Sequence, residues 1–218
     1  MKKILLLCIL SLGLSCSNAD SDTQINEKNS STTNNQAKGA PSIEDDIDQL
    51  FYNFVNSYEY LESKKLVLNF NNKFNVSISE SDFTNAEEMI SWIENNIDKT
   101  SFSSLNEAKL EWNSIVSLTE QKIVNHPQLF EFIKITDAKI TKKYFEKWIV
   151  ISPITFNDDC DRERKDCEGR VLSNYLTDCL QAGFYTGSAR AMVMAYADLS
   201  FDRGMAACGS SYRSCMGL

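Results

Sequence analysis

DDCDRERKDCEGRVLSNYLTDCL, residues 158–180, and SARAMVMAYADLSFDRGMAACGSSYRSC, residues 188–215, together hold five of the seven cysteines of this 218-residue chain. Each stretch has the composition and spacing of a helix, the first capped near Asn157 or Asp158 and the second capped by Ser188. Gly183 and Gly187 lie between them as turn formers. The two stretches therefore predict an antiparallel helical hairpin.

The cysteine spacing decides how this hairpin is cross-linked. Cys160 and Cys167 are seven residues apart on one helix, as are Cys208 and Cys215 on the other, which places the members of each pair about 10.5 Å apart along the axis. A disulfide needs Cα atoms within about 7 Å, so neither pair can close on itself. Partners on antiparallel helices have residue numbers that add to a constant, and Cys167 with Cys208 and Cys160 with Cys215 both add to 375. We therefore predict these two nested disulfides.

The second helix of the predicted hairpin carries a stripe of apolar and small residues at three- and four-residue steps. Small side chains in such a stripe let two helix backbones approach closely. In the chain-entropy model the inner disulfide, which closes roughly 40 residues, stabilises the fold by about 4 kcal/mol. The stripe consists of Met194, Ala197, Phe201, Gly204, Cys208, Ser211 and Cys215.

Cys179 has no partner in this scheme and lies on a different face of its helix, near Val171 and Tyr175. The interpretation we favour is a small buried apolar residue, which free cysteine often is. An intermolecular disulfide and a reactive thiol are the alternatives. The chain has no Cys-x-x-Cys motif and no histidine near Cys179, which argues against redox catalysis.

Residues 42–150 have a helical period and contain no cysteine. Apolar residues recur every three or four positions behind capping boxes, which predicts four amphipathic helices with short connections, a helical bundle. The first helix runs from Ser42, which forms a capping box with Asp45, through Tyr58. The second and third begin at the capping boxes of Thr84 with Glu87 and of Ser104 with Glu107. The fourth begins at Pro127 and continues through Ile140 to Trp148.

One stretch of the bundle, residues 65–79, fits two structures. Its apolar and polar residues alternate around Asn71 and Asn72, as in a β-hairpin. Leu66, Phe70 and Phe74 also lie four residues apart, as in a continuing helix. We favour a helix that continues to about Phe74.

The N-terminus has the pattern of an export signal, with Lys2 and Lys3 before a short apolar run that ends at residue 12. The following residues, Gly13-Leu14-Ser15-Cys16, resemble the lipobox of bacterial lipoproteins. The resemblance implies that residues 1–15 are a signal peptide and that Cys16 is acylated after cleavage. An ordinary secretory peptide, cleaved near Ser15 or Ala19, is the alternative.

Four segments follow from these patterns: residues 1–15 as a signal peptide, 16–41 as a lipidated cysteine and disordered tether, 42–150 as the bundle, and 151–218 as the cysteine-rich hairpin. Residues 17–41 contain one large apolar residue, Ile25, and cannot bury enough apolar surface to order themselves. The fold class is all-α, a helical bundle followed by a disulfide-stapled helical hairpin.

Composition excludes several functions. Without residues 1–15 the chain has 20 basic and 30 acidic residues, a net charge of −10, which disfavours nucleic-acid binding. His126 is the only histidine, so we expect no histidine-rich metal site and no serine triad. Six acidic residues between Asp158 and Glu168 alternate with basic ones and predict a solvated, ion-paired helix face rather than a calcium site. We expect no cofactor, no metal and no small-molecule substrate.

The hypothesis that these features favour is a non-enzymatic lipoprotein of the bacterial cell envelope. It would be held in a lipid bilayer, the outer membrane in preference to the inner, through acylated Cys16, and would face the periplasm or the cell surface. It would act as a structural or interaction module for another envelope protein. The alternatives are a secreted, toxin-like antagonist with the hairpin as effector, and a thiol enzyme that works through Cys179.

Overall fold

The structure, a computed structural model, describes residues 43–78, 82–149 and 159–218, which all belong to one compact unit. These residues form eight α-helices and one short 3-10 helix, with no strand beyond an isolated bridge. The predicted all-α class, a helical bundle followed by a disulfide-linked hairpin, is confirmed. The elements are α1 (Ile43–Val55), α2 (Tyr58–Asn71), α3 (Ala86–Asn95), η1 (Ile97–Lys99), α4 (Leu105–Asn125), α5 (Pro127–Ile135), α6 (Ala138–Trp148), α7 (Asp159–Ala182) and α8 (Gly187–Cys215).

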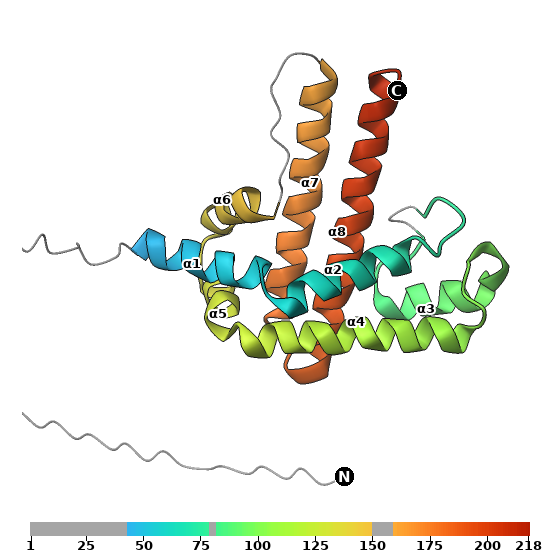
Figure 1. Ribbon diagram of the computed structural model, residues 1–218, viewed down its shortest axis with the longest axis horizontal. Helices are drawn as coiled ribbons and strands as arrows, with labels where there is room; N and C mark the ends of the chain where they lie inside the picture. Colours follow the sequence, from blue (N-terminus) through green and yellow to red (C-terminus); the bar gives the residue numbers. More distant parts are fainter. Residues whose placement is uncertain (1–42, 79–81, 150–158) are drawn as a thin grey trace, which may run out of the picture. The chain divides into compact units, whose positions relative to one another are not determined.

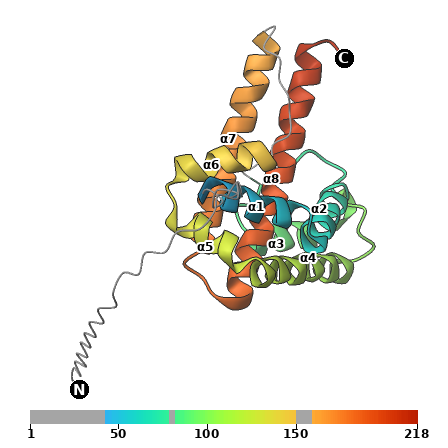
Figure 2. The ribbon, with the colours of Figure 1, turned by 60° about the vertical axis from the view of Figure 1, so that its left-hand side comes forward.

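The two longest helices, α7 and α8, are antiparallel and lie side by side along their whole length (Figures 1 and 2). The half of this pair nearest the turn packs against helices of the bundle, whereas the other half extends beyond them in both views. We call this second part, residues 159–170 of α7 and 206–215 of α8, the projecting arm.

Helix α8 lies between two hydrophobic cores. Met194 and Ala197 belong to the first core, together with residues of α1, α5, α6 and α7. Ala195 and Leu199 belong to the second, together with residues of α2, α3 and α4. A helix packed on two sides needs apolar or small residues around most of its circumference, and residues 191–199 of α8 provide them.

The predicted first helix is in fact two helices, so its continuation through Tyr58 is wrong. Helix α1 ends at Val55, and Ser57 caps α2 by accepting a hydrogen bond from the Tyr60 N–H at 3.2 Å. The Ser57 hydroxyl also donates to the Phe54 carbonyl oxygen at 2.8 Å, which fixes the turn. Tyr58, expected on the buried stripe, is 70% exposed.

Helix α2 ends at Asn71, three residues before the predicted end at Phe74, and no hairpin forms at Asn71 and Asn72. Phe74 instead forms an isolated antiparallel bridge with Thr100. Its ring lies 6.0 Å from that of Phe70 and 6.3 Å from that of Phe102. Phe70 and Phe74 therefore reach the same core although the helix ends between them, because the turn after α2 brings the Phe74 ring back to it.

The predicted fourth helix is also divided. Thr136 is extended, and the Asp137 side chain accepts a hydrogen bond from the Lys139 N–H at 2.8 Å, which begins α6. The break changes the face that the later residues present, so Ile140, expected to be buried, is 50% exposed. The bundle region thus holds six α-helices within the described residues instead of the four predicted.

The capping boxes give a mixed result. Ser104 caps α4 by accepting a hydrogen bond from the Glu107 N–H at 3.2 Å, as predicted. The box predicted at Thr84 and Glu87 is wrong by one residue, because the cap of α3 is Asn85, which accepts from the Glu88 N–H at 2.9 Å.

Helix α8 begins one residue before the predicted cap. Its N-cap residue is Thr186, and Gly187 is its first residue, so the prediction of Ser188 as the cap is wrong. Gly187 has a φ of +56°, a conformation that glycine adopts without steric strain. Gly187 is therefore required by the backbone conformation at the start of α8.

Several predictions lie outside the described residues. These are the signal peptide 1–15, the acylated Cys16 and tether 16–41, the cap at Ser42, and the cap at Asn157 or Asp158.

Candidate functional site

Both predicted disulfides are present. The inner disulfide, Cys167–Cys208, joins Cα atoms 5.7 Å apart, and the outer disulfide, Cys160–Cys215, joins Cα atoms 5.8 Å apart. Both distances are within the range that a disulfide spans. The nested pairing read from the spacing is confirmed, and it fixes the register of α7 against α8.

Gly204 of α8 lies one helical turn before Cys208 and faces Val171 of α7. A Cβ atom added to Gly204 would lie 2.8 Å from both methyl groups of Val171. The two backbones can approach this closely because Gly204 has no side chain, which is what the small residues of the stripe predicted. The numbers of this pair also add to 375, as do those of both disulfides.

The projecting arm is held by cross-links rather than by a core. Among its described residues only Glu168 and Cys208 are buried, and the buried apolar residues of α7 begin at Leu172. Two short helices without a core would be marginal in water. The two disulfides therefore supply the constraint that keeps the arm a rigid pair of helices.

The charged face of the arm is partly as predicted. Arg162 pairs with Asp159 in solvent, as expected for an exposed ion pair. Glu168 departs from the prediction of a solvated face because it is only 5% exposed, and its Oε1 accepts a hydrogen bond from Arg164 Nε at 2.7 Å. The Arg164 guanidinium also lies 5.0 Å from the centre of the Tyr212 ring, which joins α7 to α8 between the two disulfides.

A buried polar cluster that the sequence pattern did not predict lies where α4, α7 and α8 meet. Lys122, 4% exposed, forms an ion pair with Asp198 through its Nζ and Asp198 Oδ2. The Tyr175 hydroxyl donates to Asp198 Oδ1 at 2.9 Å. Burial and the Asp198 carboxylate raise the pKa of Tyr175 well above its usual value. Lys122 continues the buried stripe of α4 that runs through Trp112 and Ile115, and this spacing could have indicated a buried lysine.

A cavity of about 300 Å³ opens beside this cluster, between α2 and the α7–α8 pair. Lys122, Asp198 and Tyr175 line it on one side, and Tyr60 and Ser63 of α2 on the other. Burial, with a smaller effect of the Asp198 carboxylate, raises the pKa of Tyr60 to about 12. The tyrosines are therefore neutral hydrogen-bonding groups at neutral pH, not bases.

Cys179 is a free thiol next to the same cluster and is 5% exposed. Burial, followed by the nearby Asp198 carboxylate, raises its pKa far above the usual value of a thiol. A thiol that stays protonated is a poor nucleophile. This environment agrees with the interpretation of Cys179 as a buried apolar residue and gives no support to the thiol-enzyme alternative.

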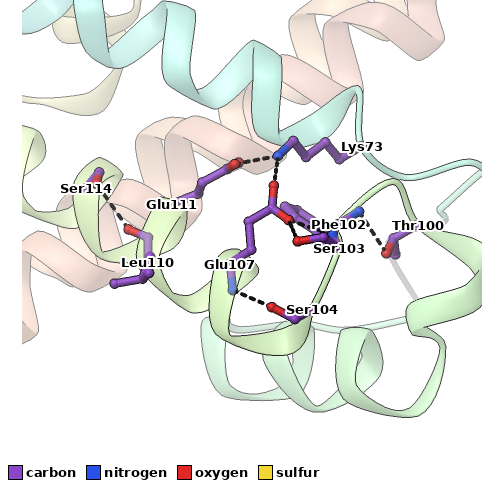
Figure 3. Close-up of polar contacts among 9 residues, drawn as sticks. All are labelled: Lys73, Thr100, Phe102, Ser103, Ser104, Glu107, Leu110, Glu111 and Ser114. Atoms are coloured by element: carbon purple, nitrogen blue, oxygen red, sulfur yellow. Dashed lines mark hydrogen bonds and ion pairs between the residues drawn. The ribbon is translucent and has the colours of Figure 1, made fainter.

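A second ionic cluster has a structural role (Figure 3). Lys73, in the turn after α2, lies between Glu107 and Glu111 of α4, with its Nζ 2.6 Å from Glu107 Oε1. The Lys73 Nζ also lies 4.9 Å from the centre of the Phe102 ring. These contacts fasten the turn after α2 to the first turns of α4, and the Lys73 hydrogen bond is the largest cause that lowers the pKa of Glu107, to about 2.

Within the described ranges, no group of three or more histidine, cysteine, aspartate or glutamate residues is arranged to hold a metal ion. In that same part of the chain no helix has the length and apolar character needed to cross a bilayer. Comparison with protein-family models, with curated proteins and with solved structures finds no match to this chain. The two disulfides suggest an oxidising, extracytoplasmic location.

Proposed function

We propose that the protein is a non-enzymatic lipoprotein of the bacterial cell envelope whose projecting arm binds another envelope protein. Acylated Cys16 would anchor it in a bilayer, the outer membrane in preference to the inner, and the protein would face the periplasm or the cell surface. The observation that carries the proposal is the position of both disulfides in the arm, outside the two cores.

The placement of the disulfides favours binding over bracing. If the hairpin served only to brace the bundle, cross-links would be expected where α7 and α8 contact the other helices. Both disulfides instead lie in the part of the hairpin that extends beyond those helices (Figure 2). A rigid arm loses little conformational entropy when it binds, which favours its use as a contact surface.

The test of the binding role leaves α8 in place, because deleting residues 151–218 would remove part of both cores. Ala207 and Ser214 are exposed on one face of the arm, and the variant Ala207→Arg/Ser214→Arg changes that face. The matched control, Asn113→Arg/Ser117→Arg, places the same charges at exposed positions of α4. Both variants and the native protein are cross-linked in intact envelopes, and the captured proteins are identified by mass spectrometry.

We expect a partner that the native protein and the α4 control capture equally and that the arm variant loses by at least tenfold. Equal capture by all three proteins would remove the binding role from the arm. The anchor is tested separately by intact mass and by a Cys16→Ala variant. Mature protein without acyl chains, or unchanged membrane association of Cys16→Ala, would contradict the lipoprotein proposal.

A further inference from the structure

The cavity beside the buried cluster has apolar walls. Val67 of α2, Ile149 after α6, and Phe201 and Met205 of α8 line it together with the polar groups already described. Sites for small ligands are mostly apolar with a few placed polar groups, and about 300 Å³ is at the lower end of their size range. The space therefore suits a small molecule with an apolar body.

Hydrogen-bond donors are free at the polar side of the cavity. A protonated lysine has three N–H donors, and among the described residues Lys122 Nζ has Asp198 as its partner. The Tyr60 hydroxyl has no hydrogen-bond partner within the described part of the chain. The oxygen atoms of a ligand could therefore accept hydrogen bonds from both groups.

The charge balance of the cavity disfavours an ionic ligand. Lys122 and Asp198 neutralise one another, and the other two charged residues of the lining, Lys64 and Asp202, carry opposite charges, so the lining has no net charge. A charged ligand group would lose its hydration in a site that offers no net charge of the opposite sign, and an incompletely paired buried charge is costly. The polar part of the ligand is thus expected to be uncharged and rich in oxygen.

We propose that this cavity binds a small uncharged amphiphile, with a hydroxyl or ester head that accepts hydrogen bonds from Lys122 and Tyr60 and a short alkyl chain against Phe201 and Met205. This proposal goes beyond the envelope-lipoprotein function and does not depend on acylation of Cys16 or on the projecting arm.

The probe is 1-monooctanoylglycerol, added to the purified full-length protein below its micellar concentration and followed by isothermal titration calorimetry. We expect one site with a Kd of order 100 µM, as befits a ligand of this size. Octanoate and octylamine have chains of the same length but carry a charge. Each should bind at least tenfold more weakly.

Two pairs of variants locate the site. Met205→Trp fills the cavity and should weaken binding of the monoglyceride at least tenfold, whereas Met192→Trp, at a 39%-exposed position of the same helix, should leave it unchanged. Tyr60→Phe removes one hydroxyl and should weaken binding about two- to tenfold. Its control is Tyr58→Phe, at the exposed start of α2.

Three results would overturn the proposal: no binding of the monoglyceride, binding of octanoate or octylamine at equal strength, or binding that Met205→Trp and Tyr60→Phe leave unchanged. Circular dichroism of each variant establishes that it is folded. If Met205→Trp does not fold, the Tyr60→Phe and Tyr58→Phe pair decides the outcome alone.

Discussion

Replacing Gly204 by alanine tests whether close approach of α7 and α8 holds the hairpin in register. The new Cβ atom would lie 2.8 Å from both Val171 methyl groups, well inside ordinary contact distance. Valine is stiff at χ1 and cannot turn its methyl groups away without strain. The two helices cannot shift along their axes to relieve this contact either, because the Cys167–Cys208 disulfide fixes them one turn away.

The magnitude follows from two opposed terms. Glycine to alanine within a helix stabilises by about 1 kcal/mol, whereas overpacking costs typically about 1–3 kcal/mol. Gly209→Ala provides the matched control on the same helix, because its Cβ would meet only Arg213 Nη1, at 3.8 Å. We therefore expect Gly204→Ala to be less stable than Gly209→Ala by about 2 kcal/mol, roughly 4–8 °C in Tm.

The assay is thermal and urea unfolding followed by circular dichroism, with the disulfides intact. Val171→Ala removes both methyl groups, so the double variant Gly204→Ala/Val171→Ala should recover about 1–2 kcal/mol as a coupling energy. The reasoning is refuted if Gly204→Ala is as stable as Gly209→Ala, or if Val171→Ala gives no recovery.

Three further predictions concern the arm, the buried thiol and the ionic cluster. Reduction of both disulfides, of which the inner one contributes about 4 kcal/mol in the chain-entropy model, should open the projecting arm to trypsin while the bundle stays protected. Identical digests before and after reduction would contradict this. Cys179 should react with iodoacetamide only after denaturation, because burial raises its pKa; rapid alkylation of the native protein, detected by mass, would show an accessible thiolate. Glu107→Gln should lower the urea midpoint at pH 7. Folded Glu107 has a pKa of about 2, below the usual 4.5, so its contribution to stability is present above pH 4.5 and is lost as the pH falls towards 2. A difference in urea midpoint between the variant and the native protein that persists at pH 2 would argue against the ion pair with Lys73.

The sequence predicted the all-α class and the hairpin register well because both depend on short-range constraints. Seven-residue cysteine spacing and the limited reach of a disulfide leave one nested pairing, and the structure has it. Periodicity likewise placed Ile115, Ile133 and Tyr144 in the cores. These features need no knowledge of the tertiary fold.

Helix breaks and the buried cluster could not be predicted in the same way. Ser57 and Asp137 cap helices only because the chain turns there, and an uninterrupted apolar period hides such turns. Lys122 and Asp198 are 76 residues apart, so their pairing depends on how α4 packs against α8. The cavity beside them exists only in the assembled fold.

The position of α8 between the two cores bears on how the protein is made. This helix is synthesised after every helix that it packs against, and until it is available the first core lacks Met194 and Ala197 while the second lacks Ala195 and Leu199. Neither half of the bundle can complete its folding before α8 has been synthesised. A chain truncated before residue 191 would therefore leave both hydrophobic cores incomplete.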